Sequence, residues 1–114
     1  MDATELILLY DYYGDLLTDR QKECFELRYN QDLSLGEIAI ELGISRQGVY
    51  DNLNRTEALL KNMEQKTGCV GRDVRCRKAA GAIRETAQAM LQSNDKVVTE
   101  FAQQIMIAVQ GLEE

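Results

Sequence analysis

The side chains that could carry chemistry in this chain are few, and their spacing matches no common catalytic or metal site. Asp11, Asp15 and Asp19 follow one another at steps of four residues, which places neighbouring side chains on one face of a helix. Paired carboxylates can act as general acid and base, but a solvated acidic face has the same spacing. The chain has no histidine, the commonest general base and metal ligand. We therefore expect no enzyme activity, no metal and no cofactor.

The three cysteines, Cys24, Cys69 and Cys76, fit neither a paired-thiol metal motif nor a redox motif. Cys24 lies in an apolar helical pattern, so we expect a buried core residue and not a reactive thiol. The apolar run at residues 6–9 is too short for a signal peptide. The longest uncharged stretch, residues 101–112, is too short to span a membrane. We expect a cytoplasmic protein with reduced thiols.

Charge is distributed unevenly along the chain. The 13 basic and 19 acidic residues give a net charge of −6, which does not favour a protein that coats nucleic acid through bulk charge. Residues 1–45 carry three basic and ten acidic side chains, whereas residues 67–84 carry five basic and one acidic. Any contact with nucleic acid must therefore be local.

Residues 34–53 have the pattern of a helix-turn-helix. Ser34 and Glu37 have the spacing of a capping box at a helix start, Gly43 can take the left-handed conformation that ends that helix, and Ser45 caps the next one. The apolar and small positions have steric roles in such a motif: Ala39 allows close crossing, Ile44 fills the angle, and Val49 and Leu53 pack onto Ile38 and Leu42. Two helices packed for structure alone can show the same spacing.

The outward positions of the second helix are the candidate nucleic-acid-binding residues. They are Arg46, Gln47, Tyr50, Asn54 and Arg55. Arginine and glutamine side chains can form paired hydrogen bonds with base edges, and a tyrosine can stack on a base of single-stranded RNA. Asp51 lies on the same face and would repel phosphate.

The remaining periodicity predicts an all-α chain of six helices with no strand. Thr4 and Thr18 are the expected caps of the first two helices. The expected helices are residues 5–17, 19–29, 35–42, 46–66, 73–92 and 95–112, with a loop at 67–72. We expect one domain over residues 1–114, made of a helix-turn-helix half (1–66) and a C-terminal helical pair (73–114).

The C-terminal pair carries two further features. An apolar stripe on the last helix, Val98, Phe101, Ile105 and Val109 or Leu112, is expected to be core. Two long helices beyond a compact helix-turn-helix unit need somewhere to bury their apolar faces, and a symmetric homodimer would provide it. A basic cluster, Arg72, Arg75, Arg77 and Lys78, is equally compatible with a solvated face and with phosphate contacts.

Several runs of sequence are similar to known families. Residues 17–21, 25–29 and 34–39 resemble region four of bacterial sigma factors, the domain that reads promoter DNA, and the likeness extends over residues 17–61. The run Ile44-Ser-Arg-Gln-Gly-Val-Tyr-Asp-Asn-Leu53, followed by Arg55-Thr-Glu57, looks like the YlxM family. These are small cytoplasmic helix-turn-helix proteins of Gram-positive bacteria, typically encoded beside the protein-targeting GTPase of the signal recognition particle.

The resemblance implies a non-enzymatic regulatory protein of the signal recognition particle pathway. One hypothesis is binding to DNA or to the particle's RNA through the outward face of the second helix. The alternative is a protein adaptor, in which the acidic N-terminal half docks on a basic partner such as the particle's GTPase without contacting nucleic acid. The motif favours the first hypothesis and the overall charge favours the second.

Overall fold

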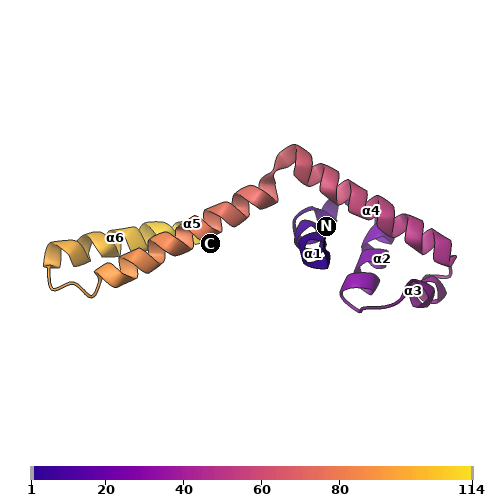
Figure 1. Ribbon diagram of the computed structural model, residues 1–114, viewed down its shortest axis with the longest axis horizontal. Coiled ribbons are helices and arrows are strands. Elements are labelled where there is room, and N and C mark those ends of the chain that lie inside the picture. Colours follow the sequence, from indigo (N-terminus) through magenta and orange to yellow (C-terminus); the bar gives the residue numbers. More distant parts are fainter. Residues whose placement is uncertain (1, 114) are drawn as a thin grey trace. The chain divides into compact units, whose positions relative to one another are not determined.

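The computed structural model describes residues 2–113, which form six α-helices, one short 3-10 turn and no strand (Figure 1). The elements are α1 (Ala3–Tyr13), η1 (Gly14–Leu16), α2 (Asp19–Tyr29), α3 (Leu35–Leu42), α4 (Arg46–Thr67), α5 (Cys69–Met90) and α6 (Lys96–Glu113). The all-α prediction is confirmed. Contacts divide the chain into two compact units, residues 1–70 and 71–114.

The helix starts of the first unit follow from local capping. Thr18 and Ser34 each form a complete capping box, with Gln21 and Glu37 respectively, and the Ser45 hydroxyl accepts a hydrogen bond from the backbone N–H of Gly48. These side chains satisfy backbone donors that have no partner within the helix. The predicted starts of α2, α3 and α4 are confirmed.

The predicted first helix was wrong at both ends. Asp2, not Thr4, caps α1, because its carboxylate accepts from the N–H of Glu5. The helix ends at Tyr13 instead of continuing to residue 17, and the chain passes through a 3-10 turn. Gly14 packs so closely on Tyr10 that a Cβ there would lie 3.1 Å from the ring.

The predicted loop at residues 67–72 was also wrong. Gly68 alone interrupts the helices, with φ 63°, and α5 begins at the next residue. The first backbone donors of α5 find partners on α4: the N–H of Val70 donates to Glu64 at 3.0 Å and that of Cys69 to Thr67 at 3.3 Å. The new helix therefore needs no linker to supply its cap.

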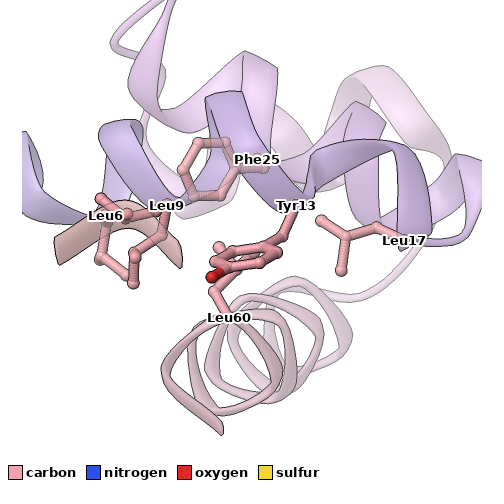
Figure 2. Packing of buried hydrophobic residues seen from close by; sticks show 7 residues of the cluster. Leu6, Leu9, Tyr13, Leu17, Phe25 and Leu60 are labelled. Atoms are coloured by element: carbon pink, nitrogen blue, oxygen red, sulfur yellow. The ribbon is translucent and has the colours of Figure 1, made fainter. Parts of the chain in front are cut away.

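The first core of the N-terminal unit joins α1, α2, α4 and the first turn of α5. Figure 2 shows its labelled side chains converging, with Leu60 of α4 directed toward Tyr13 of α1. Its buried members are Leu6, Leu9, Tyr13, Leu17, Phe25, Leu60 and Val70. The Tyr13 hydroxyl donates to Glu64 at 2.6 Å, so a buried polar group ties α1 to the end of α4.

The second core positions the helix-turn-helix. Its buried members are Cys24, Leu27, Ile38, Ala39 and Val49, and Leu42, Ile44 and Leu53 pack against them. This is the packing that the spacing predicted. Cys24 is fully buried, and burial raises the pKa of its thiol, in agreement with a core role.

The second unit contains most of α5 and all of α6. The two helices are joined by an ion pair of 2.9 Å between Arg84 and Glu113, and their buried residues are small: Ala80, Ala87, Ala102 and Val109. The predicted stripe on the last helix is only partly core. Phe101 and Leu112 are 57% and 71% exposed, because the face directed at α5 is centred on Ala102 and Val109.

No helix between residues 2 and 113 combines the length and the apolar character needed to cross a membrane.

Tyr10 provides a pH-dependent test of the first core. Burial and a 2.8 Å hydrogen bond to Glu26 raise its pKa to about 12. The folded state therefore favours the protonated phenol, so the stability that Tyr10 contributes is complete below pH about 10 and is lost as the pH rises toward 12. In a tyrosinate absorbance titration, with helicity recorded in parallel, Tyr10→Phe should remove a late-titrating group. Loss of a group with an ordinary pKa would contradict this contact.

Candidate nucleic-acid interface

The exposed side of α4 presents the predicted binding residues in two rows. Arg46, Tyr50 and Asn54 succeed one another at steps of four, as do Gln47, Asp51 and Arg55 in the neighbouring row. All six side chains are exposed, and Tyr50 is 50% exposed although it is a large aromatic residue. An exposed helix face with two guanidinium groups, amides and an aromatic ring has the groups that base edges and phosphates require.

The opposite side of α4 is fixed by the second core. Val49 of α4 and Ile38 of α3 are both fully buried and belong to this core. The turn between the helices is closed by Gly43, whose φ of 67° is left-handed, and by a 3.1 Å hydrogen bond from the N–H of Ile44 to the carbonyl of Ala39. The first turns of α4 are thus held rigidly while their outer face stays open.

The charge on this face is close to balanced. Arg46 and Arg55 form no ion pair within the described part of the chain. Asp51 accepts a 3.0 Å hydrogen bond from the amide of Gln47. This contact occupies one of the two N–H donors of the Gln47 amide. The two arginines exceed the one carboxylate by a single charge, which is small for a nucleic-acid interface.

Arg55 lies apart from the first row, beside a cleft between α2 and α4. This cleft is lined by Gln21, Arg55, Ala58, Leu59 and Asn62. Sequence reasoning missed Gln21 and Asn62 as neighbours of Arg55. The steps from Arg55 to Leu59 and Asn62 place them on one helix face, but only the tertiary packing brings Gln21 of α2 to that face.

The three aspartates of the first unit that are spaced at steps of four lie on three separate elements. Asp11 lies on α1, Asp15 in η1 and Asp19 in the first turn of α2, and all three are exposed. Asp15 lies 3.8 Å from Lys22. Among residues 2–113, no group of three or more side chains is arranged to hold a metal ion. A separate groove between α2 and α3 is lined by Glu23, Glu26 and Glu41 around Leu27 and Leu42.

The short α3, the tight glycine turn and the half-exposed α4 define a helix-turn-helix protein. The chain belongs to the family described as "UPF0122: Putative helix-turn-helix protein, YlxM / p13 like", whose model matches residues 1–105. The resemblance identified from the sequence is thereby confirmed. The family is described by its motif and not by a reaction.

Individual relatives agree with this assignment. A UPF0122 protein of Bacillus cereus (strain AH187) is 36% identical over 111 residues, which cover 97% of this chain and 96% of that protein. A UPF0122 protein of Thermoanaerobacter sp. (strain X514) is 56% identical over 71 residues, 62% of this chain. One of Acetivibrio thermocellus is 59% identical over 66 residues. These two matches span 61% and 56% of the relatives' own lengths.

Proposed function

We propose that this chain binds nucleic acid through the exposed first turns of α4 and acts as a cytoplasmic regulator of the signal recognition particle pathway. One observation carries the proposal. Two rows of exposed side chains, which begin at Arg46 and Gln47, lie on a helix whose other side is buried at Val49. The arrangement supports the role of a recognition helix, which contacts base edges and phosphates through its first turns. The link to the particle rests on the resemblance to the YlxM family.

The particle's RNA is the proposed target in preference to promoter DNA. A free aromatic face at Tyr50 suits the stacking of unpaired bases, which RNA loops and bulges supply. A protein that binds duplex DNA usually makes roughly six to ten phosphate contacts. The exposed face of α4 has few cations, which suits a compact structured RNA better than a long duplex.

The direct test is fluorescence anisotropy with the particle's RNA, an unrelated structured RNA of equal length, and random duplex DNA. Arg46 and Arg55 supply about two phosphate-neutralising charges per chain. Raising the salt from about 50 to about 200 mM should therefore weaken binding roughly tenfold. Selective binding to the particle's RNA with this salt response is the expected result. Affinity that does not change with salt would contradict a phosphate-contacting interface.

Arg46→Ala is expected to weaken that binding by at least roughly fivefold, the lower limit for loss of one specific arginine contact. Lys66→Ala is the matched control, because Lys66 is an exposed cation in the last turn of the same helix, away from the two rows. It removes the same charge and should leave the affinity within about twofold. Equal losses in the two variants would show that only net charge matters and would refute a local site.

The acidic groove between α2 and α3 supports a second candidate function, docking on a basic protein such as the particle's GTPase. Glu23, Glu26 and Glu41 line this groove together with Leu27 and Leu42. Carboxylates around a partly apolar groove complement a basic amphipathic segment. A pull-down of the GTPase after nuclease treatment tests this function: recovery that is lost in Glu41→Lys supports it, and recovery only with intact RNA contradicts it.

A further inference from the structure

The second unit buries very little of its apolar surface by itself. Neither of the two hydrophobic cores includes a residue beyond Val70, and the buried positions of α5 and α6 beyond Val70 are three alanines and Val109. In contrast, large apolar side chains remain exposed on both helices: Val74, Ile83, Val97, Phe101, Ile107 and Leu112. A unit of residues 71–114 is also near the lower size limit, about 40 residues, at which a domain needs oligomerisation or cross-links for stability.

Three of these side chains, Ile83, Phe101 and Leu112, lie on one face of the α5–α6 pair. On α5, Ile83, Thr86 and Met90 follow at steps of three and four, and on α6 the corresponding positions are Phe101, Ile105, Ala108 and Leu112. The two rows meet at a shallow groove lined by Ile83, Thr86 and Met90 from α5 and by Ile105 from α6. We call these seven residues the uncharged face.

The other side of the pair has a different character. Arg84 and Glu113 form their ion pair there, beside Met106, Ile107 and Gln110. Lys96 and Glu100 form a second, longer pair of 4.0 Å on α6. No charged residue occupies any of the seven positions of the uncharged face, so an ion-pairing or nucleic-acid partner has nothing to bind on it.

The uncharged face is large enough to be an interface. Ile83, Phe101 and Leu112 are 46%, 57% and 71% exposed. With about 200 Å² for a fully exposed large apolar side chain, these three alone present roughly 350 Å². Contiguous apolar patches above a few hundred Å² mark interaction sites, and the other four residues extend this one toward the roughly 800 Å² per partner of a standard interface.

We propose that the uncharged face is covered by the same face of a second copy of this chain, which forms a symmetric four-helix bundle. Two observations select this occupant: the face lacks charge, and its own small unit lacks a core. In a symmetric dimer, a two-fold axis brings one patch against the same patch of the second copy. The first unit offers no equivalent partner, because its surface between residues 2 and 45 is strongly acidic. Helix pairs bury exactly such three- and four-spaced apolar rows when they associate into bundles.

The test is sedimentation equilibrium of the full chain at micromolar concentration, in reducing buffer because Cys69 and Cys76 are exposed. The wild type should have twice the 12.9 kDa chain mass. Phe101→Glu should raise the dimer dissociation constant roughly 100-fold or more, because each dimer would bury two unpaired carboxylates. Ile107→Glu is the matched control: it places the same charge at an exposed isoleucine of the same helix, outside the uncharged face, and should leave a dimer.

Helicity is measured for both variants, and Phe101→Gln serves as a milder substitution if Phe101→Glu loses helix. A wild type of monomer mass overturns the proposal, whatever the variants do. A dimer that survives Phe101→Glu with helicity intact, or one that Ile107→Glu disrupts equally, also overturns it. The assay contains no nucleic acid, so its outcome is independent of the function proposed for α4.

Discussion

Replacing Phe25 by alanine should lower the free energy of unfolding of the first unit by about 3–5 kcal/mol. Phe25 is 2% exposed and lies at the centre of the first core. It stacks on Tyr10 with ring centroids 4.3 Å apart and contacts Tyr29 at 4.5 Å. The substitution removes the ring from a closely packed site that three helices surround, so the loss combines the transfer energy of the ring with the cost of a cavity.

Tyrosine fluorescence during urea unfolding measures this effect selectively. The chain has five tyrosines and no tryptophan, and every tyrosine lies between residues 10 and 50, within the first unit. Leu16→Ala is the control, because Leu16 is 71% exposed and its truncation should change the free energy by less than about 0.5 kcal/mol. Similar losses in the two variants would mean that Phe25 is not the centre of the core.

Ile38→Ala should cost about 2–5 kcal/mol and should also abolish nucleic-acid binding. Ile38 is fully buried in the second core, where it holds α3 against Val49 of α4. None of the binding residues is altered by the substitution. Binding is lost because α4 is no longer fixed in the orientation that presents Arg46 and its neighbours.

The matched control for this prediction lies two residues away on the same helix. Ile40 is 85% exposed, so Ile40→Ala should be nearly neutral in both unfolding and anisotropy measurements. If Ile38→Ala remained folded and bound RNA with unchanged affinity, the orientation of α4 would be irrelevant to binding. That result would contradict a recognition helix held by its core.

The helix starts at Thr18, Ser34 and Ser45 and the turn at Gly43 were predictable because each depends on side chains within three or four residues. The start of α5 was not predictable. It depends on Glu64, which accepts the N–H of Val70 and the hydroxyl of Tyr13 from a helix far away in sequence. Gly68 and Gly71 favoured a loop at residues 67–72, but the tertiary contacts allow a break of one residue, Gly68.

Phe101 shows a second limit of sequence patterns. The periodicity places Phe101 in the apolar stripe of the last helix, but it does not determine which edge of that stripe packs against α5. The structure centres the packed side on Ala102, and Phe101 lies about a quarter of a turn away. Small residues allow the two helices to approach closely, and the large residues of the stripe lie at the edge of the contact between α5 and α6.

The sequence predicts which side chains of the candidate site are exposed, but not which other side chains they contact. Exposure of Arg46, Tyr50 and Asn54 follows from the period of a helix that buries Val49. The hydrogen bond from Gln47 to Asp51 depends on the side-chain conformations. The position of Arg55 beside Gln21 depends on the packing of α2 against α4.

The most direct test of a binding face on α4 is a titration of the isotope-labelled chain with the particle's RNA, followed by amide chemical shifts. We expect the largest shift changes between residues 45 and 55 and at Gln21, with little change at Glu23, Glu26 and Glu41. Changes concentrated on those three glutamates, or no change at any position at saturating RNA, would contradict the account.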